Sequence, residues 1–379
     1  MKWYNVYSKI IESYLRNRLQ YVSLRNNQSH KNSRIGETLR GIPQGASLSS
    51  LLFIIIINDL PEHIKNSITF FFADDSQIVI SGPLTSINIL KAKLEEDLDN
   101  VINWMKNNKL ELSIPKSLIM YCGRPSLLNQ LDDFEIQMNG QTIQRVDSLK
   151  ILGVMIDDKL NWTTQINNVS KKCNCMLSTL FPVRDIVSSH SRQILINAYV
   201  LSVLNYASII WLKPSKSNYV NVKKILNRSA RFIFRRRFNE SVSEEINDKL
   251  KWLTPKYKYQ FEVLKFAFSI INNCAPDYFN NYLIFNNFTT KQTRNHTYHV
   301  AIQDNYHTSV NTIKFNATQL WLDLPDLFQV NMIYPMFKKL LYEYLLSIQS
   351  AEYFITNNDN NICNYSCIES TAVSNSNYD

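Results

Sequence analysis

Apolar side chains recur at helical spacing near the start of the chain, which predicts a helix over roughly residues 3–15. Residues 21–24 favour a short strand. A turn-forming hexad at residues 40–45 precedes a very apolar stretch, and we expect a helix there from about Ser47 to Asn58. Leucine, valine and isoleucine recur between residues 94 and 105, which predicts an amphipathic helix that ends at the polar pair Asn107-Asn108.

Short strand-like segments lie between and after these helices. Thr69–Ala73 and Gln77–Ile80 predict a hairpin with Asp74 and Asp75 at its tip. Further strands are predicted at residues 110–114, 117–121, 134–138, 142–146 and 149–156. Asn139-Gly140 favours a tight hairpin turn, because both residues accept positive φ angles.

The pattern changes after about Asp158, where helical periodicity replaces alternation. Helices are predicted at residues 167–180, 191–211, 219–234 and 256–272. The sequence therefore predicts an α/β segment followed by helical ones, with boundaries at 1–157, 158–250, 251–350 and 351–379. The last segment is rich in Asn and Ser, and we expect it to fray.

Composition narrows the class of protein. Of the 379 residues, 45% are apolar and only 19% charged, which argues against wholesale disorder. Lysine and arginine outnumber aspartate and glutamate by 41 to 32, a balance that suits a polyanionic partner. The longest apolar run, Leu51–Ile57, is too short to span a bilayer, so no membrane segment is expected.

The cysteine content and the first residues of the chain indicate the cellular compartment in which the protein folds. Six cysteines in a long chain that opens without a signal-peptide apolar region indicate a reduced, intracellular protein. Nothing in the sequence separates the nucleus from the cytoplasm.

Two segments carry candidate chemistry. Asp74 and Asp75 follow the apolar run Ile68–Phe72, and carboxylates at a hairpin tip suit a divalent cation. Neighbouring strand side chains point to opposite faces, so we expect Asp74 as the full ligand and Asp75 in support. An ordinary hydrated turn is the alternative.

The second segment is Gly41–Ser47, which leads into the apolar helix. Its two glycines allow close backbone approach to a ligand, and the helix start offers free N–H groups to phosphates. A plain loop before a helix is the alternative.

Taken together, these motifs resemble those of reverse transcriptases from non-long-terminal-repeat retrotransposons, the jockey-like group in particular. The likeness rests on the order and spacing of GIPQG, the apolar run with INDLP-like Ile57–Pro61, and Phe72-Ala73-Asp74-Asp75. Trp104–Lys116 and Leu149–Trp162 resemble later motifs of that family, the second being its primer-gripping hairpin. The resemblance covers about residues 8–348.

The resemblance implies a polymerase palm of the split-βαβ α/β type, then a helical thumb and a helical C-terminal region. It implies that Asp74 and Asp75 hold Mg²⁺ or Mn²⁺, that Gln44 and Gly45 contact the incoming nucleotide or the template, and that Lys116 protonates pyrophosphate. The implied reaction joins deoxynucleoside triphosphates to a DNA primer 3′-hydroxyl on an RNA template, by two-metal phosphoryl transfer.

One departure from the family concerns the other catalytic carboxylate, which the family takes from an A-F-D motif well before the GIPQG loop. Residues 1–40 contain only Glu12 and Glu37 as acids. We therefore expect the C-terminal part of a longer polyprotein, whose own activity is in doubt. A catalytically dead nucleic-acid-binding remnant is the alternative.

A basic segment in the helical half suggests a nucleic-acid contact. Residues 213–237 contain no acid, and four of their cations fall at i, i+4, i+7 and i+11. The candidate nucleic-acid-binding residues are Lys224, Arg228, Arg231, Arg235, Arg236 and Arg237. Such a stripe suits a thumb that follows a phosphate backbone, with a solvated charged face as the alternative.

Overall fold

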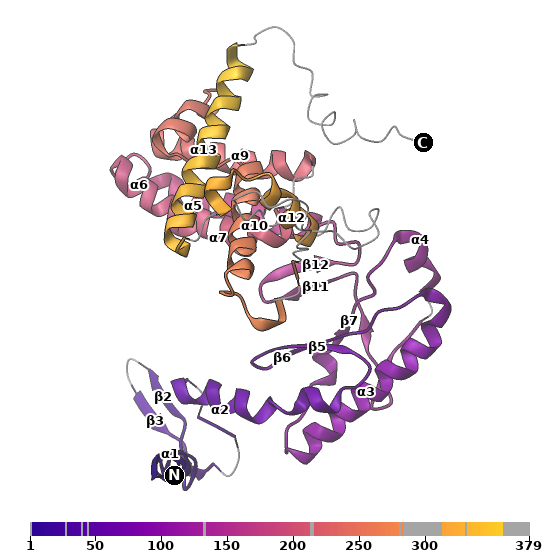
Figure 1. Ribbon diagram of the computed structural model, residues 1–379. Helices are drawn as coiled ribbons and strands as arrows, with labels where there is room; N and C mark the ends of the chain where they lie inside the picture. Colours follow the sequence, from indigo (N-terminus) through magenta and orange to yellow (C-terminus); the bar gives the residue numbers. More distant parts are fainter. Residues whose placement is uncertain are drawn as a thin grey trace. The chain divides into compact units, whose positions relative to one another are not determined.

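The computed structural model describes residues 2–26, 29–38, 41–43, 45–131, 134–212, 216–279, 282–283, 313–329 and 332–358. The chain divides into two compact units, Met1–Asp147 and Ser148–Asp379 (Figure 1). Among the described residues, the first unit mixes helices with short strands. The second is helical apart from one hairpin at its start. This agrees with the predicted change from alternating to helical patterns.

The first half of unit 1 contains three helical segments and three antiparallel strand pairs. The helices are α1 (Lys2–Leu15), α2 (Ser47–Ile57) and the 3₁₀ turn η1 (Leu60–His63). The strand pairs are β1 (Leu19–Gln20) with β4 (Gly36–Glu37), β2 (Ser23–Asn26) with β3 (Ser29–Asn32), and β5 (Ile68–Phe72) with β6 (Asp75–Val79). The predicted apolar helix and the acidic hairpin are both confirmed.

The second half of unit 1 begins with the long helix α3 (Ile87–Asn107). It is followed by the 3₁₀ turn η3 (Ile114–Lys116), β7 (Leu118–Ile119), α4 (Pro125–Leu128), β8 (Gln137–Met138), β9 (Gln141–Thr142) and β10 (Gln144–Arg145). β8 and β9 are joined by Asn139 and Gly140 at φ 51° and 73°, the turn that the sequence predicts. The predicted strand at 110–114 is wrong: Pro115 lies in η3, where its missing N–H costs nothing.

Helix α3 organises the core of unit 1, because two of its faces bury different clusters. Val101 and Trp104 pack with residues of α2, η1 and the loop that follows, against Phe71 of β5. Leu98 and Ile102 pack with Ile136 and residues of the β8–β9 hairpin. One helix thus supports both hairpins.

Unit 2 opens with a hairpin of β11 (Ser148–Ile151) and β12 (Val154–Asp157). The prediction of one strand over 149–156 is wrong, because Leu152 and Gly153, at φ 46° and 87°, turn the chain back. The principal helices that follow are α5 (Thr163–Leu180), α6 (Ser189–Ile196), α7 (Ser202–Asn205), α8 (Ser208–Trp211), α9 (Lys216–Phe234), α10 (Pro255–Ile271), α12 (Ile313–Leu322) and α13 (Tyr334–Asn358). The predicted single helix over 191–211 is interrupted by a π turn at Asn197–Leu201 and by Ala207 at φ 49°.

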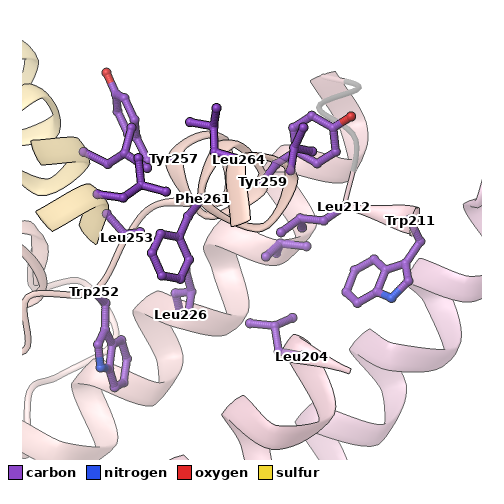
Figure 2. Packing of buried hydrophobic residues seen from close by; sticks show 14 of the residues in the cluster. Leu204, Trp211, Leu212, Leu226, Trp252, Leu253, Tyr257, Tyr259, Phe261 and Leu264 are labelled. Carbon is purple, nitrogen blue, oxygen red and sulfur yellow. The ribbon is translucent and has the colours of Figure 1, made fainter. Parts of the chain in front are cut away.

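The core of unit 2 is one large apolar cluster centred on α9 and α10 (Figure 2). Phe261 of α10 points toward Leu226 of α9, and Trp211 and Leu212 belong to the same cluster. A core of this size explains why the helical half is a unit of its own.

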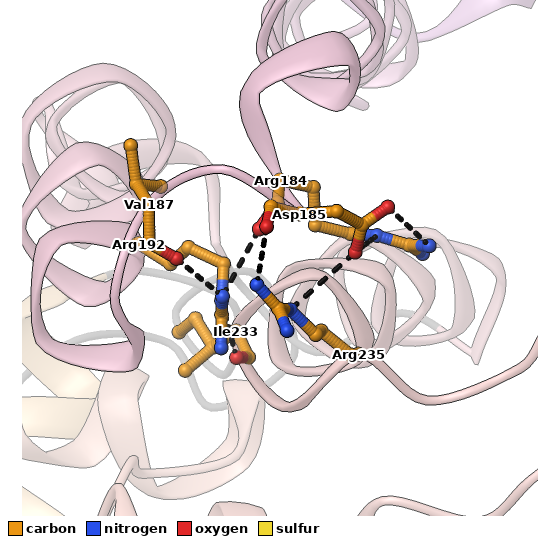
Figure 3. Close-up of polar contacts among 6 residues, drawn as sticks. All are labelled: Arg184, Asp185, Val187, Arg192, Ile233 and Arg235. Carbon is orange, nitrogen blue, oxygen red and sulfur yellow. Dashed lines mark hydrogen bonds and ion pairs between the residues drawn. The ribbon is translucent and has the colours of Figure 1, made fainter.

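A buried arginine fastens three segments of unit 2 (Figure 3). Arg192 of α6 is only 5% exposed and donates hydrogen bonds to the carbonyls of Ile233, Arg184 and Val187, at 2.7, 3.0 and 2.7 Å. Burial lowers the pKa of its guanidinium from the ordinary value. The three carbonyls supply the polar surroundings that a buried cation requires.

Replacing Arg192 with methionine keeps much of the side-chain volume but leaves three carbonyls without a donor. We expect a loss of about 2–4 kcal/mol in the free energy of unfolding, from the cost of unsatisfied buried groups. Urea unfolding followed by tryptophan fluorescence measures it. Arg228→Met, at an exposed position of α9, is the control and should change stability by less than about 0.5 kcal/mol. Equal effects in both variants would contradict the role of Arg192.

Candidate functional site

The acidic pair lies at the tip of the β5–β6 hairpin, as predicted, but its two members occupy different places. Phe72 pairs with Asp75, so Ala73 and Asp74 form the two-residue turn and Asp75 begins β6. Ala73 has φ 52°, a left-handed conformation that is uncommon for a residue other than glycine. Both aspartates are exposed.

The hairpin has one face against the core and one face toward solvent. Phe71 and Ile78 pack against the α3 cluster. On the other face Ile68, Phe70 and Phe72 are 61%, 54% and 63% exposed. Asp75 lies directly across from Phe72, and cross-strand partners project to the same side of a hairpin. The Asp75 carboxylate therefore belongs to an apolar, solvent-facing surface.

The donor chemistry of the pair suits a hard divalent cation, because magnesium takes one or two carboxylates and completes its shell with water or phosphate oxygens. Within the described residues, no group of three His, Cys, Asp or Glu side chains lies close enough to hold a metal ion. The described site thus fits one weakly held ion at the hairpin tip, and it lacks the carboxylates that two ions would need.

The GIPQG loop is tied to the helices on either side of it. Gly41 and Gly45 have φ 83° and 86°, and a Cβ at either position would meet open space, so their backbone conformation is what favours glycine. Arg18 donates hydrogen bonds to the carbonyls of Leu15 and Gly41. The hydroxyl of buried Ser49 donates to the Pro43 carbonyl. Gln44 lies outside the described residues.

Lys116 is exposed at the end of η3. Among the described residues, no hydrogen bond or ion pair joins it to Asp74 or Asp75. The structure therefore does not bring this candidate proton donor into contact with the acidic pair.

The basic segment of the helical unit does not form one continuous helical face. Helix α9 ends at Phe234, and Arg235 follows it with φ 55°. Arg235 lies 3.4 Å from the Asp185 carboxylate and donates to the Asp185 carbonyl (Figure 3). The expected stripe at i, i+4, i+7 and i+11 is therefore broken at its last member.

Acids from other segments neutralise part of this positive charge. Arg236 forms an ion pair with the buried carboxylate of Glu245, at 2.6 Å. Arg231 donates only to the main-chain carbonyl of Glu240, which is not an ion pair. Burial is the largest single influence and would raise the pKa of Glu245. The hydrogen bond and charge of Arg236, a backbone hydrogen bond and the charge of Lys249 together outweigh it, so the net shift of the pKa is downward. Because the carboxyl pKa is lowered, the pair persists at neutral pH and is lost only as the pH falls through that lowered value.

Three members of the basic set remain available at the surface. Lys224 is exposed on α9, and Arg228 is exposed and donates to the Asn174 side chain. Arg237 is exposed beyond the helix. The side chains of these three are exposed and form no ion pair with the described residues, whereas Arg231 is half-buried and donates to a backbone carbonyl.

Several positioning residues give no signal in the sequence. Asp97 of α3 is fully buried and accepts hydrogen bonds from the backbone of Lys65 and Asn66, just ahead of β5. In unit 2, the buried Asp157 carboxylate accepts from two backbone N–H groups, and the hydroxyl of Tyr206 donates to the Leu152 carbonyl at 2.6 Å. Each contact joins residues that are distant or unremarkable in sequence, so no local pattern could indicate it.

The comparisons with known proteins agree with these features. Residues 2–156 match the reverse transcriptase (RNA-dependent DNA polymerase) family. The chain is 25% identical over 238 residues, 60% of its length, to a probable RNA-directed DNA polymerase from transposon BS of Drosophila melanogaster. It is 25% identical over 170 residues, 43% of its length, to the RNA-directed DNA polymerase from mobile element jockey of the same fly.

The alignments cover 25% and 17% of these two relatives, so the chain spans a quarter or less of their length. No helix among the described residues is long and apolar enough to cross a membrane. The family match contains the GIPQG loop and the acidic hairpin, and it ends within β12. Residues 2–156 are therefore similar to the reverse transcriptase family, and the predicted resemblance to the enzymes of jockey-like non-long-terminal-repeat retrotransposons is confirmed.

Proposed function

We propose that this chain is part of an RNA-directed DNA polymerase of a retrotransposon, which adds deoxynucleotides to a primer 3′-hydroxyl on an RNA template. The observation that carries the proposal is the position of Asp74 and Asp75, exposed together at a hairpin tip inside the segment that matches the family. The names of the two relatives support the same reaction. The proposed setting is intracellular, in the nucleus or the cytoplasm.

The proposed architecture is a palm of the split-βαβ type in residues 1–157, a thumb in 158–250, a helical C-terminal region in 251–350 and a tail after it. Support comes from α3, which packs one face against the β5–β6 hairpin and another against β8 and β9, as a palm helix would. Helix α9, which carries Lys224, Arg228 and Arg231, and helix α5, which packs with it in one core, support the thumb.

The proposed chemistry assigns a task to each site residue. Asp74 and Asp75 hold Mg²⁺ or Mn²⁺, which when bound neutralises charge on the reacting phosphate oxygens. Gly45, with Gln44, lies against the nucleotide or the template, in a loop that Arg18 and Ser49 fasten from both sides. Lys116 gives a proton to the leaving pyrophosphate. This transfer requires a bound substrate that reaches both Lys116 and the acidic pair.

A second candidate function is nucleic-acid binding without catalysis. The observation that favours it is the small number of carboxylates: two at the hairpin tip, and only Glu12 and Glu37 as acids before residue 41. Glu12 already pairs with Arg16 at 2.7 Å. The thumb contacts would be the same in both functions, and only primer extension separates them.

The metal proposal predicts weak binding at the hairpin tip. We expect a Kd for Mn²⁺ of about 1 mM or weaker, because two carboxylates leave most of the coordination shell to water. Asp74→Asn should weaken binding further, whereas Asp59→Asn, at another exposed aspartate of the same unit, should not. Paramagnetic broadening of NMR signals measures both. Tight binding that survives Asp74→Asn would show that the site lies elsewhere.

The thumb proposal predicts which cations contact a template–primer duplex. The triple change K224Q/R228Q/R237Q should reduce the slope of log K against log salt by about 2–3. Each phosphate contact releases counterions on binding, so removing three contacts reduces the number released. The control K93Q/K106Q/K109Q removes three exposed lysines of unit 1 and should leave the slope unchanged. Fluorescence anisotropy with an RNA–DNA hybrid measures this. Equal slopes in both variants would refute the thumb assignment.

The activity proposal predicts no primer extension by the chain alone on poly(rA)/oligo(dT). A missing electrostatic element of a catalytic site costs ~10²–10³ in rate, and the carboxylates needed for a second ion are absent from the described site. Fusing the fingers and A-F-D segment of a related element before Met1 should restore extension, and Asp74→Ala should abolish it again. A folded but inactive fusion would favour the non-catalytic function.

A further inference from the structure

The segment between α1 and the GIPQG loop is the most one-sided run of charge in unit 1. Residues 16–34 contain five lysines or arginines and no acid. The nearest acids on either side are Glu12 and Glu37. The basic residues are Arg16, Arg18, Arg25, Lys31 and Arg34.

The β2–β3 hairpin presents these cations on an exposed, two-stranded arm. Arg25 lies directly across from His30, and Leu24 across from Lys31. The Ser23 hydroxyl is 3.0 Å from the His30 ring nitrogen Nε2, which braces the pair. Arg25, His30, Lys31 and Arg34 are all exposed. Since cross-strand partners share a face, the arm carries cations on both of its faces.

The hairpin cations, like the exposed side chains of Lys224, Arg228 and Arg237 in the helical unit, form no ion pair with the described residues. Arg16 is held by Glu12 and Arg18 by backbone carbonyls. Arg25, Lys31 and Arg34 form no ion pair with any described residue. Three uncompensated cations on a small arm create a positive potential that a polyanion would neutralise.

Apolar and aromatic side chains lie beside these cations. Tyr21, Val22 and Leu24 are 56%, 63% and 70% exposed. A phenol ring next to cations is the combination that binds single strands, since unpaired bases stack on the ring while the cations contact phosphates. The bases of a duplex are already paired and stacked, so they would not stack on the Tyr21 ring.

We propose that the β2–β3 hairpin, with Tyr21 and Arg34, is a binding site for single-stranded nucleic acid. It binds the sugar–phosphate backbone without sequence preference, through Arg25, Lys31 and Arg34. Arg18, in the segment that leads into the arm, donates a hydrogen bond to the Gly41 carbonyl, so that segment contacts the GIPQG loop. The site is independent of the metal pair and of the thumb residues.

The test measures binding of the full chain to a fluorescent 20-nucleotide oligo(U) by anisotropy at several salt concentrations. The variant R25Q/K31Q/R34Q should lose affinity on the order of 10²-fold at 50 mM salt and reduce the salt slope by about 2, as three lost phosphate contacts require. The charge-preserving variant R25K/K31R/R34K should retain most of the affinity. Tyr21→Ala should weaken binding while leaving the salt slope unchanged.

The control K93Q/K106Q/K109Q removes the same charge from α3 and the turn that follows it, and it should bind oligo(U) like the unaltered chain. If the control loses as much affinity as the hairpin variant, net charge alone explains binding and the proposal is overturned. If R25Q/K31Q/R34Q loses binding to anionic phospholipid vesicles but still binds oligo(U), the proposal is overturned in favour of a membrane surface. The hybrid-duplex assay of the thumb variants is a separate readout, so either proposal can fail alone.

Discussion

The acidic hairpin depends on a buried carboxylate far from it in sequence. Asp97 is fully buried in α3 and accepts hydrogen bonds from the backbone N–H groups of Lys65 and Asn66, at 3.0 and 3.1 Å. A buried charge needs such donors, and losing them would cost several kcal/mol. These residues lead directly into β5, so Asp97 fixes the start of the strand that ends at Phe72, just before the turn of Ala73 and Asp74. The same helix packs against Phe71, which sets the orientation of the hairpin.

The need of a buried charge for hydrogen-bonding partners also explains the structural roles of Arg192 and Arg236 in the helical unit. In the helical unit, Arg192 is buried among carbonyls, and Arg236 neutralises the buried Glu245. These cations hold segments together, and replacing them would leave buried groups without partners. Among the described residues, Arg25, Lys31 and Arg34 of the β2–β3 arm pair with no acid, which is why we assign them to a ligand.

The sequence predicted those features that a local pattern determines. The apolar run of α2, the periodicity of α3 and the Asn139-Gly140 turn each appear where expected. The errors occur where a single residue overrides the pattern, as Gly153 does in dividing an apparently continuous strand. For the site, the exposed Asp74-Asp75 tip was predictable, whereas the pairing of Arg235 with Asp185 joins residues 50 positions apart and leaves no trace in local spacing.

Asp75, one of the two proposed metal ligands, lies on the exposed apolar face of the β5–β6 hairpin. Asp75 lies across from Phe72, beside Phe70 and Ile68, on a face that water now reaches. In water the attraction between a carboxylate and a cation is weak, because the high dielectric constant screens it. Covering those three apolar side chains would remove water from one side of Asp75 and strengthen every electrostatic interaction there. The affinity of the acidic pair for an ion is therefore coupled to the burial of its apolar neighbours, and the two change together.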